Sequence, residues 1–173
     1  MKRLVLVFGT LAALFGLISC ATEADESSIV GEWGVTEYTY NEYEDRDDGS
    51  RKYLIAASLS HPKGEYLALI FDEDGSGKNV CYGYMEMVGS ETQFVEHYIS
   101  YPFKWSLNNG KLVLNYTAEN PRDSKDSVLE SHLSFVVLGT EFKASTTGSR
   151  LTLIGDQTID GHKMESKVKL KKK

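Results

Sequence analysis

The chain has 173 residues and a formal net charge of −6, from 19 lysine and arginine residues against 25 aspartate and glutamate residues. This acidic balance argues against nucleic acid and against anionic lipid headgroups as partners. The length suits one domain that buries most of its apolar surface, and we expect no second domain.

The first twenty residues have the pattern of a bacterial lipoprotein signal. Two basic residues precede an apolar run over residues 4–18, and the run ends at Leu17-Ile18-Ser19-Cys20. Because this run is shorter than the roughly 20 residues that span a bilayer, we expect residues 1–19 to be removed as a signal peptide. Cys20 should then be acylated and hold the protein on a membrane. The sequence therefore predicts an outer-membrane lipoprotein of the cell envelope, on the periplasmic face or the cell surface.

Removal of the signal leaves 17 basic and 25 acidic residues, a formal charge of −8. Residues 20–30 are polar and acidic, and we expect an acylated tether with nothing to pack, followed by one domain over residues 31–173. Cys81 is the only other cysteine. The domain therefore has no intramolecular disulfide to form, and a buried, inert thiol is expected.

From residue 31 onward the pattern is typical of antiparallel strands. Short runs of Val, Thr, Tyr, Phe, Ile and Leu are separated by Gly, Asn, Asp and Pro, and no long helical period is present. The acidic segment 41–51 and the polar segment 118–127 are expected to be exposed loops.

The segment Asp72-Glu73-Asp74-Gly75-Ser76-Gly77 predicts a hairpin. Because side chains alternate between the two faces of a strand, this turn places two sets of residues on one face, which we assign to the interior. They are Leu67, Leu69 and Phe71 before the turn and Val80, Tyr82 and Tyr84 after it. The opposite face carries Ile70, Cys81, Met85 and Met87 and is also apolar. Either the assignment is reversed or something covers the outside, so the buried face of residues 79–88 stays open.

Asn109-Gly110 predicts a second hairpin, because both residues accept the positive φ of a type I′ turn. This turn sets a register that pairs the following residues: Asn108 with Lys111, Leu107 with Leu112, Trp105 with Leu114, and Phe103 with Tyr116. All the large apolar side chains then share one face, which we expect to be covered.

Further strands are expected at residues 128–138, 149–155 and 163–170, the last two joined by a turn at Asp160-Gly161. The final strand alternates lysine with apolar residues. We interpret it as an edge or closing strand that its lysines protect from further pairing.

Catalytic and metal-binding patterns are weak in this sequence. The histidines His61, His97, His132 and His162 lie on separate segments without metal-ligand spacing, and no nucleophile elbow or phosphate-binding loop is present. We therefore expect no enzyme activity, no metal and no cofactor. Asp72 and Asp74 resemble the opening of a calcium loop, but a structural turn is the favoured interpretation. Cys81, Met85 and Met87 suggest a soft-metal site, for which core packing is the favoured alternative.

Gly31-Glu32-Trp33 at the start of the first strand resembles the Gly-x-Trp signature of lipocalins. The chain also resembles small lipocalin-like lipoproteins of Bacteroidetes in the spacing of its later elements. These elements are the two hairpins, Leu151-Thr152-Leu153 and the lysine-flanked final strand. This resemblance implies an all-β, antiparallel up-and-down barrel of about eight strands. It also implies that Trp33 closes one end of the barrel under a basic residue from a late strand, for which Arg150, Lys167 and Lys169 are candidates.

An eight-stranded barrel can be filled by side chains or can hold one small ligand. We expect a non-enzymatic lipoprotein that binds a small hydrophobic or amphipathic molecule. The candidate ligand-lining residues are Tyr101, Phe103, Trp105, Leu112, Leu114 and Tyr116. The alternative is a surface protein-interaction module with a filled barrel, an inhibitor or accessory subunit whose loops at 41–51 and 118–127 meet a basic partner. An open apolar interior favours the first function, and a filled barrel with an exposed apolar patch favours the second.

Overall fold

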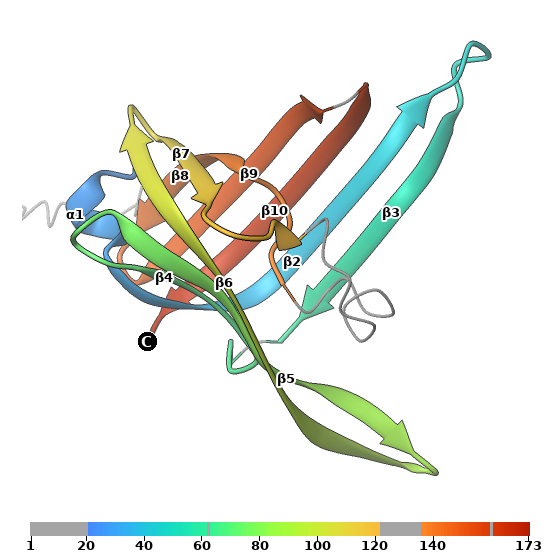
Figure 1. Cartoon of the computed structure of the whole chain (residues 1–173), viewed down its shortest axis with the longest axis horizontal. Helices are drawn as coiled ribbons and strands as arrows, with labels where there is room; N and C mark the ends of the chain where they lie inside the picture. The colour runs from blue at the N-terminus through green and yellow to red at the C-terminus, as the bar shows by residue number, and fades with distance from the viewer. Residues whose placement is uncertain (1–20, 62, 122–135, 160) are drawn as a thin grey trace, which may run out of the picture.

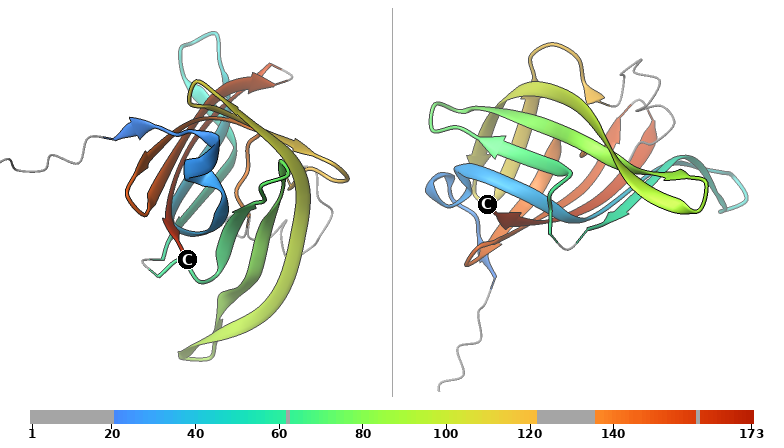
Figure 2. Two further views of the ribbon diagram at one scale, coloured as in Figure 1. Left: turned by 90° about the vertical axis from the view of Figure 1, so that its left-hand side faces the viewer. Right: turned by 90° about the horizontal axis from the view of Figure 1, so that it is seen from below.

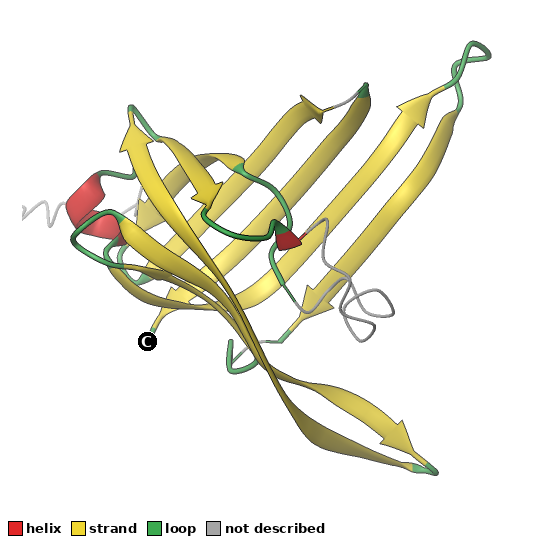
Figure 3. Ribbon diagram, in the orientation of Figure 1, coloured by secondary structure: helices red, strands yellow, loops and turns green. Residues whose placement is uncertain are grey.

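The computed structural model describes residues 21–61, 63–121, 136–159 and 161–173, and almost all of its regular structure is strand (Figure 3). Its elements in chain order are β1 (Thr22–Glu23), α1 (Glu26–Ile29), β2 (Gly31–Asp45), β3 (Arg51–Ser60), β4 (Leu67–Phe71), β5 (Ser76–Val88), β6 (Glu91–Asn108), β7 (Lys111–Tyr116), β8 (Glu141–Thr147), β9 (Arg150–Ile159) and β10 (His162–Lys172). No helix among these residues is long and apolar enough to cross a membrane.

Eight antiparallel strands form a closed barrel, as the lipocalin-like resemblance predicts. The strand order is β8-β7-β6-β5-β4-β2-β10-β9, and pairing of β9 with β8 closes the ring. The first half of β2 pairs with β4, and its second half pairs with β3. The hairpins β2–β3 and β5–β6 extend beyond the closed part and splay apart (Figure 1). We call this end of the barrel the wide end and the opposite end, where α1 lies, the narrow end.

The narrow end is covered by a segment that was expected to be an unpacked tether. β1 pairs with β8, and the N–H of Ala24 donates to the carbonyl of Ala144 at 3.1 Å. The Asp25 side chain caps α1, and Ile29 at the end of this helix is fully buried. The tether prediction is therefore wrong for residues 22–29, since Ala24 and Ile29 supply enough apolar surface to dock the chain on the barrel.

Trp33 lies at the narrow end and is fully buried. Its indole N–H donates to the carbonyl of Ile29 at 2.6 Å, which joins α1 to the first barrel strand. The basic residue over its ring is Lys172, whose Nζ lies 5.4 Å from the ring centroid. Arg150, Lys167 and Lys169 were the expected candidates, and that expectation is wrong because the register of β10 against β2 pairs Lys172 directly with Trp33.

The Asn109-Gly110 hairpin forms in the predicted register. Leu107 pairs with Leu112, Trp105 with Leu114, and Phe103 with Tyr116. Asn109 and Gly110 have φ of 48° and 70°, as a type I′ turn requires. The apolar face of this hairpin packs into the barrel core.

The strands on either side of the turn at residues 72–77 pair in a register that differs from the predicted one by one residue. Phe71 pairs with Gly77, Leu69 with Asn79, and Leu67 with Cys81. The inward assignment of Leu67, Leu69 and Phe71 is confirmed, but their partners on the inner face are Gly77, Asn79 and Cys81. Val80 and Tyr82 lie on the outer face, since a change of one residue in register turns a strand over. A bulge between Cys81 and Gly83 then brings Tyr84 back to the interior, where it packs against the core.

Two further expectations need correction. Residues 41–51 are not a loop, because β2 runs to Asp45 and β3 begins at Arg51. Residues 136–138 form no strand, while residues 128–135 lie outside the described part, and the strand of this region is β8 at Glu141–Thr147. The final two strands are confirmed and are longer than predicted. β10 pairs on both sides and closes the barrel against β2.

Candidate functional site

The six candidate ligand-lining residues share the inner wall formed by β6 and β7, as the hairpin register predicts. Phe103, Leu112 and Leu114 have 1 % or less of their surface exposed, and Trp105 has 9 %. Phe71 packs edge-on against Trp105 and tilted against Phe103, each at 5.7 Å between ring centroids. Side chains this inaccessible leave no space for a water-sized molecule beside them. The part of the barrel toward the narrow end is therefore filled. Tyr101 and Tyr116 are the two candidates that lie level with Asn79, nearer the wide end.

A short chain segment, Val136–Leu138, occupies the middle of the barrel. All three side chains are fully buried in the core. The Asn79 amide, which is also fully buried, donates to the carbonyl of Val137 at 2.7 Å and accepts from its N–H at 3.3 Å. These bonds imitate the pairing of two strands, so a side chain of β5 satisfies backbone groups that would otherwise be buried without partners. We call residues 136–138 the plug.

Tyr38 holds the other side of the plug. Its hydroxyl accepts from the N–H of Leu138 at 2.8 Å. Burial raises the pKa of the Tyr38 phenol well above its ordinary value, so the group stays neutral inside the barrel. The Asn79 amide also donates to the Tyr116 hydroxyl at 3.0 Å. The plug is thus fixed to both β2 and β5, which flank β4 in the barrel wall.

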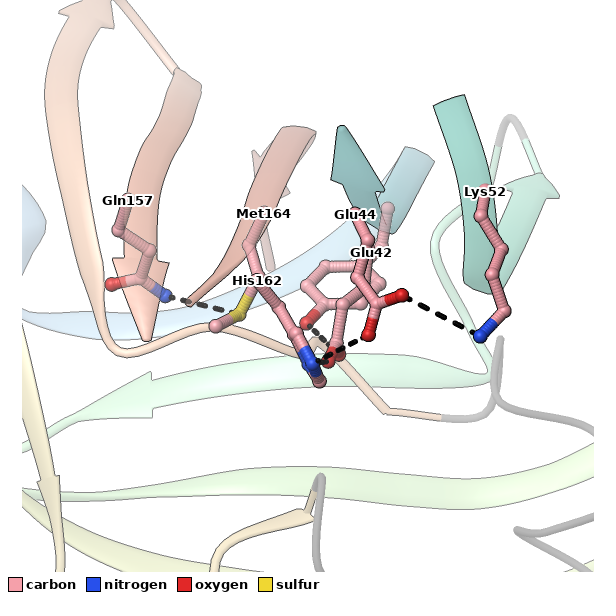
Figure 4. Close-up of polar contacts among 7 residues, drawn as sticks. Glu42, Glu44, Lys52, Gln157, His162 and Met164 are labelled. Carbon is pink, nitrogen blue, oxygen red and sulfur yellow. Dashed lines mark hydrogen bonds and ion pairs between the residues drawn. The ribbon is translucent and has the colours of Figure 1, made fainter. Parts of the chain in front are cut away.

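A polar cluster lies on the wide-end side of the plug, and its members come from β2, β3 and β10 (Figure 4). Glu42 is 2 % exposed, and its carboxyl group accepts from the Tyr40 hydroxyl at 3.2 Å. The two ring nitrogens of His162 contact different carboxyl groups, Glu42 at 3.0 Å and Glu44 at 3.1 Å. Lys52 pairs with Glu44 at 3.5 Å. We call Tyr40, Glu42, Glu44 and His162 the carboxyl cluster.

Half-buried apolar side chains lie on both splayed hairpins, and those on β3 flank the carboxyl cluster, since Ile55 pairs with Glu42 and Ala57 with Tyr40. They pack against the core without being enclosed by it: Ile55, Ala57 and Leu59 on β3, and Tyr84 and Ile99 on β5 and β6. Burying a carboxyl group among apolar side chains is costly unless hydrogen bonds compensate. The wide end therefore combines an apolar wall with one compensated polar centre.

The β5–β6 hairpin also carries apolar side chains on its exposed surface. Met85, Met87, Val88, Phe94 and Tyr98 are between 44 % and 73 % exposed. These residues are five of the eight exposed large apolar side chains in the described part of the chain, and all five lie on one projecting arm (Figure 1). Exposed apolar residues gathered in this way are typical of contact surfaces.

The two metal-site hypotheses find a structural explanation instead. Asp74 accepts from both the N–H and the hydroxyl of Ser76, which lowers the pKa of its carboxyl group, and the Trp105 indole donates to the carbonyls of Asp72 and Ser76. These contacts make the segment a hydrogen-bonded turn. Cys81 is fully buried while Met87 is 73 % exposed, so the soft-metal residues do not converge. Within the described ranges, no three His, Cys, Asp or Glu side chains are grouped to hold a metal ion.

Of the histidines that the structure describes, His162 is the one that contacts two carboxyl groups. The ring of His61 lies tilted against Tyr66, at 4.0 Å between centroids, and His97 lies 6.1 Å from Tyr84. His132 is outside the described residues. Sequence reasoning missed Asn79 and Glu42. Asn79 stands between Lys78 and Val80 within an apolar strand, and this polar residue at a core position is the signal that could have identified it.

The chain belongs to the lipocalin-like domain family, whose model matches residues 29–133. Two solved structures from Bacteroides species are similar to this chain, each with a TM-score of 0.40. One is a lipocalin-like protein from Bacteroides uniformis, 14 % identical, with 83 % of this chain and 97 % of that chain covered. The other is an uncharacterized protein from Bacteroides eggerthii, 15 % identical, with 83 % and 98 % covered. No curated protein matches the sequence.

Proposed function

We propose that this protein binds a small amphipathic molecule, without catalysis, at the wide end of its lipocalin-like barrel. The observation that carries the proposal is the buried Glu42 carboxyl group beside the half-buried apolar side chains of β3. Ligand sites are mostly apolar, with a few polar groups that fix the orientation of the ligand. The apolar part of the ligand would lie against Leu59 and Ile99, and its polar head would meet the carboxyl cluster.

The site that we propose lies on the wide-end side of the plug, whereas the sequence favoured the interior on its narrow-end side. Trp105 and Leu114 are packed with their neighbours below Val136–Leu138, and a ligand there would have to displace buried side chains. Tyr101 and Tyr116 stand at the level of the plug and remain candidate contacts.

The chemistry of the carboxyl cluster favours a ligand head that donates hydrogen bonds. Glu42 and Glu44 supply acceptor oxygens, and Lys52, the nearby cation, is already paired with Glu44. A fatty-acid carboxylate would therefore face two acidic side chains. A long-chain amine or alcohol would instead donate to them.

We expect saturable binding of the neutral dye Nile red, competed by a long-chain amine or alcohol better than by the matching fatty acid. Leu59→Ser should weaken dye binding about five- to tenfold, because apolar contact contributes about 25 cal/mol per Å². The matched control is Leu54→Ser on the same strand, since Leu54 points outward and is 37 % exposed. Fluorescence titration measures both variants, and equal effects of the two would contradict the wide-end site.

A second function, protein interaction, is favoured by the exposed apolar arm. If the arm is the apolar binding surface, Met87→Ser should weaken dye binding while Leu59→Ser leaves it unchanged, because Met87 is 73 % exposed and lies outside the barrel. The same titration therefore separates the ligand-binding function from the interaction module.

Membrane anchoring through Cys20 is part of the proposal, and the lipoprotein signal at residues 1–20 supports it. Cys20→Ser should move the protein from the membrane fraction to the soluble or uncleaved fraction, because the acylation site is lost. Fractionation with labelled fatty acid measures this. The matched substitution Cys81→Ser should leave the label in place, and undiminished labelling of Cys20→Ser would contradict the anchor. Protease accessibility on intact cells then distinguishes the periplasmic face from the cell surface.

A further inference from the structure

A basic groove lies on the outer face of the barrel where β9 begins and β10 ends. Its volume is about 420 Å³, and its charged lining residues are Arg150, Lys169, Lys171 and the acidic Glu37. The hydroxyl-bearing residues Thr36, Ser149 and Thr152 also line it. Arg150 and Lys171 are direct cross-strand partners. Like charges directly opposite each other repel, so this pair is unfavourable unless an anion lies between them.

The charges around the groove are compensated unevenly. Lys169 pairs with Glu37 at 2.5 Å, and Lys173 pairs with Glu32 at 2.8 Å. Lys172 lies over the Trp33 ring. Arg150 and Lys171 have no carboxylate within 4.0 Å among the residues that the structure describes. These two cations are therefore available to an external anion.

The groove lies beside the point where the chain arrives from Cys20. Thr22 of β1 pairs with Thr146, Thr147 pairs with Arg150 across the β8–β9 turn, and Arg150 pairs with Lys171. The C-terminus lies at the same end as α1 in Figures 1 and 2. Two residues of chain reach at most about 7 Å, so an acyl anchor at Cys20 would keep this end at the membrane surface.

We propose that Arg150 and Lys171 bind phosphate groups of anionic lipids in the membrane that holds the anchor, so that the barrel sits with its wide end facing away. This inference rests on the proposed acylation of Cys20. The net charge of the chain is negative, and Glu23, Asp25 and Glu26 also lie at this end. Screening limits each charge to a range of about 10 Å at 0.1 M salt, so the groove acts locally despite the overall charge.

Amine-reactive footprinting of the acylated protein in vesicles tests this orientation. With vesicles that contain phosphatidylglycerol, Lys171 should be labelled about fivefold more slowly than with phosphatidylcholine alone, since a cation near an anionic surface gains about 1 kcal/mol. Lys163, at the other end of β10 and paired with Asp45, is the matched control and should be labelled equally in both. Raising the salt concentration should remove the difference, as should Arg150→Gln.

The outcomes separate the groove from the anchor. Protein that does not float with either type of vesicle would contradict acylation and leave no anchored end to orient, which overturns the proposal. Protein that floats with both, but shows equal labelling of Lys171, would overturn the lipid contact alone. Free inorganic phosphate that protects Lys171 as well as the anionic vesicles do would show a soluble-anion site instead of a lipid contact.

Discussion

Replacing Trp33 by alanine should lower the free energy of unfolding by about 3–5 kcal/mol, in the range of buried aromatic truncations. Trp33 is fully buried, its indole N–H holds the carbonyl of Ile29, and Lys172 covers its ring. Alanine would remove the contact that joins α1 to the barrel and leave a cavity at the narrow end. Urea unfolding followed by circular dichroism measures the loss.

Two control variants separate the parts of this effect. Trp33→Phe retains an aromatic ring but loses the hydrogen bond to Ile29, so it should cost less than alanine, about 1–2 kcal/mol. Tyr98→Ala removes an aromatic ring that is 66 % exposed and should change the stability by no more than about 0.5 kcal/mol. A loss below about 1 kcal/mol for Trp33→Ala would show that Trp33 does not close the barrel.

The two central hairpins show what sequence patterns could predict here and where they stopped. Asn109-Gly110 fixes its turn type through local backbone preference, and its register followed from that alone. The turn at residues 72–77 is instead held by the Trp105 indole, which is distant in sequence. Local chemistry did not fix the register of this turn, and a one-residue error exchanged the inner and outer faces of β5 before its bulge at Cys81–Gly83.

The interior was harder to predict because its contents depend on tertiary contacts. Val136–Leu138 has the composition of a strand, yet it fills the barrel as a plug because Asn79 and Tyr38 satisfy its backbone. β8 was missed because only Phe142 on it is a large apolar residue. Glu42 stands in an acidic run typical of a loop. The strand β2 places it beside Tyr40, and pairing of β2 with β10 brings it to His162.

Replacing Asn79 by alanine should cost about 2–4 kcal/mol and increase binding of Nile red. The substitution removes the partners of both the N–H and the carbonyl of Val137, and each buried group left unsatisfied costs about 1–3 kcal/mol. Since these bonds hold the plug against β5, their loss should also raise the population in which the interior is open. Urea unfolding measures the first effect, and dye titration below the unfolding transition measures the second.

Asn115→Ala is the matched control, because Asn115 on β7 is exposed and should change neither stability nor dye binding. A second variant, Leu59→Ser combined with Asn79→Ala, locates the added dye. If release of the plug opens the interior toward the narrow end, the double variant should still bind more dye than Leu59→Ser alone. The added dye would contact Trp105 and Leu114, which Leu59→Ser does not affect. A destabilised Asn79→Ala protein with unchanged dye binding would show that the plug fills the barrel without guarding a space, and would leave the wide end as the place where a ligand can bind.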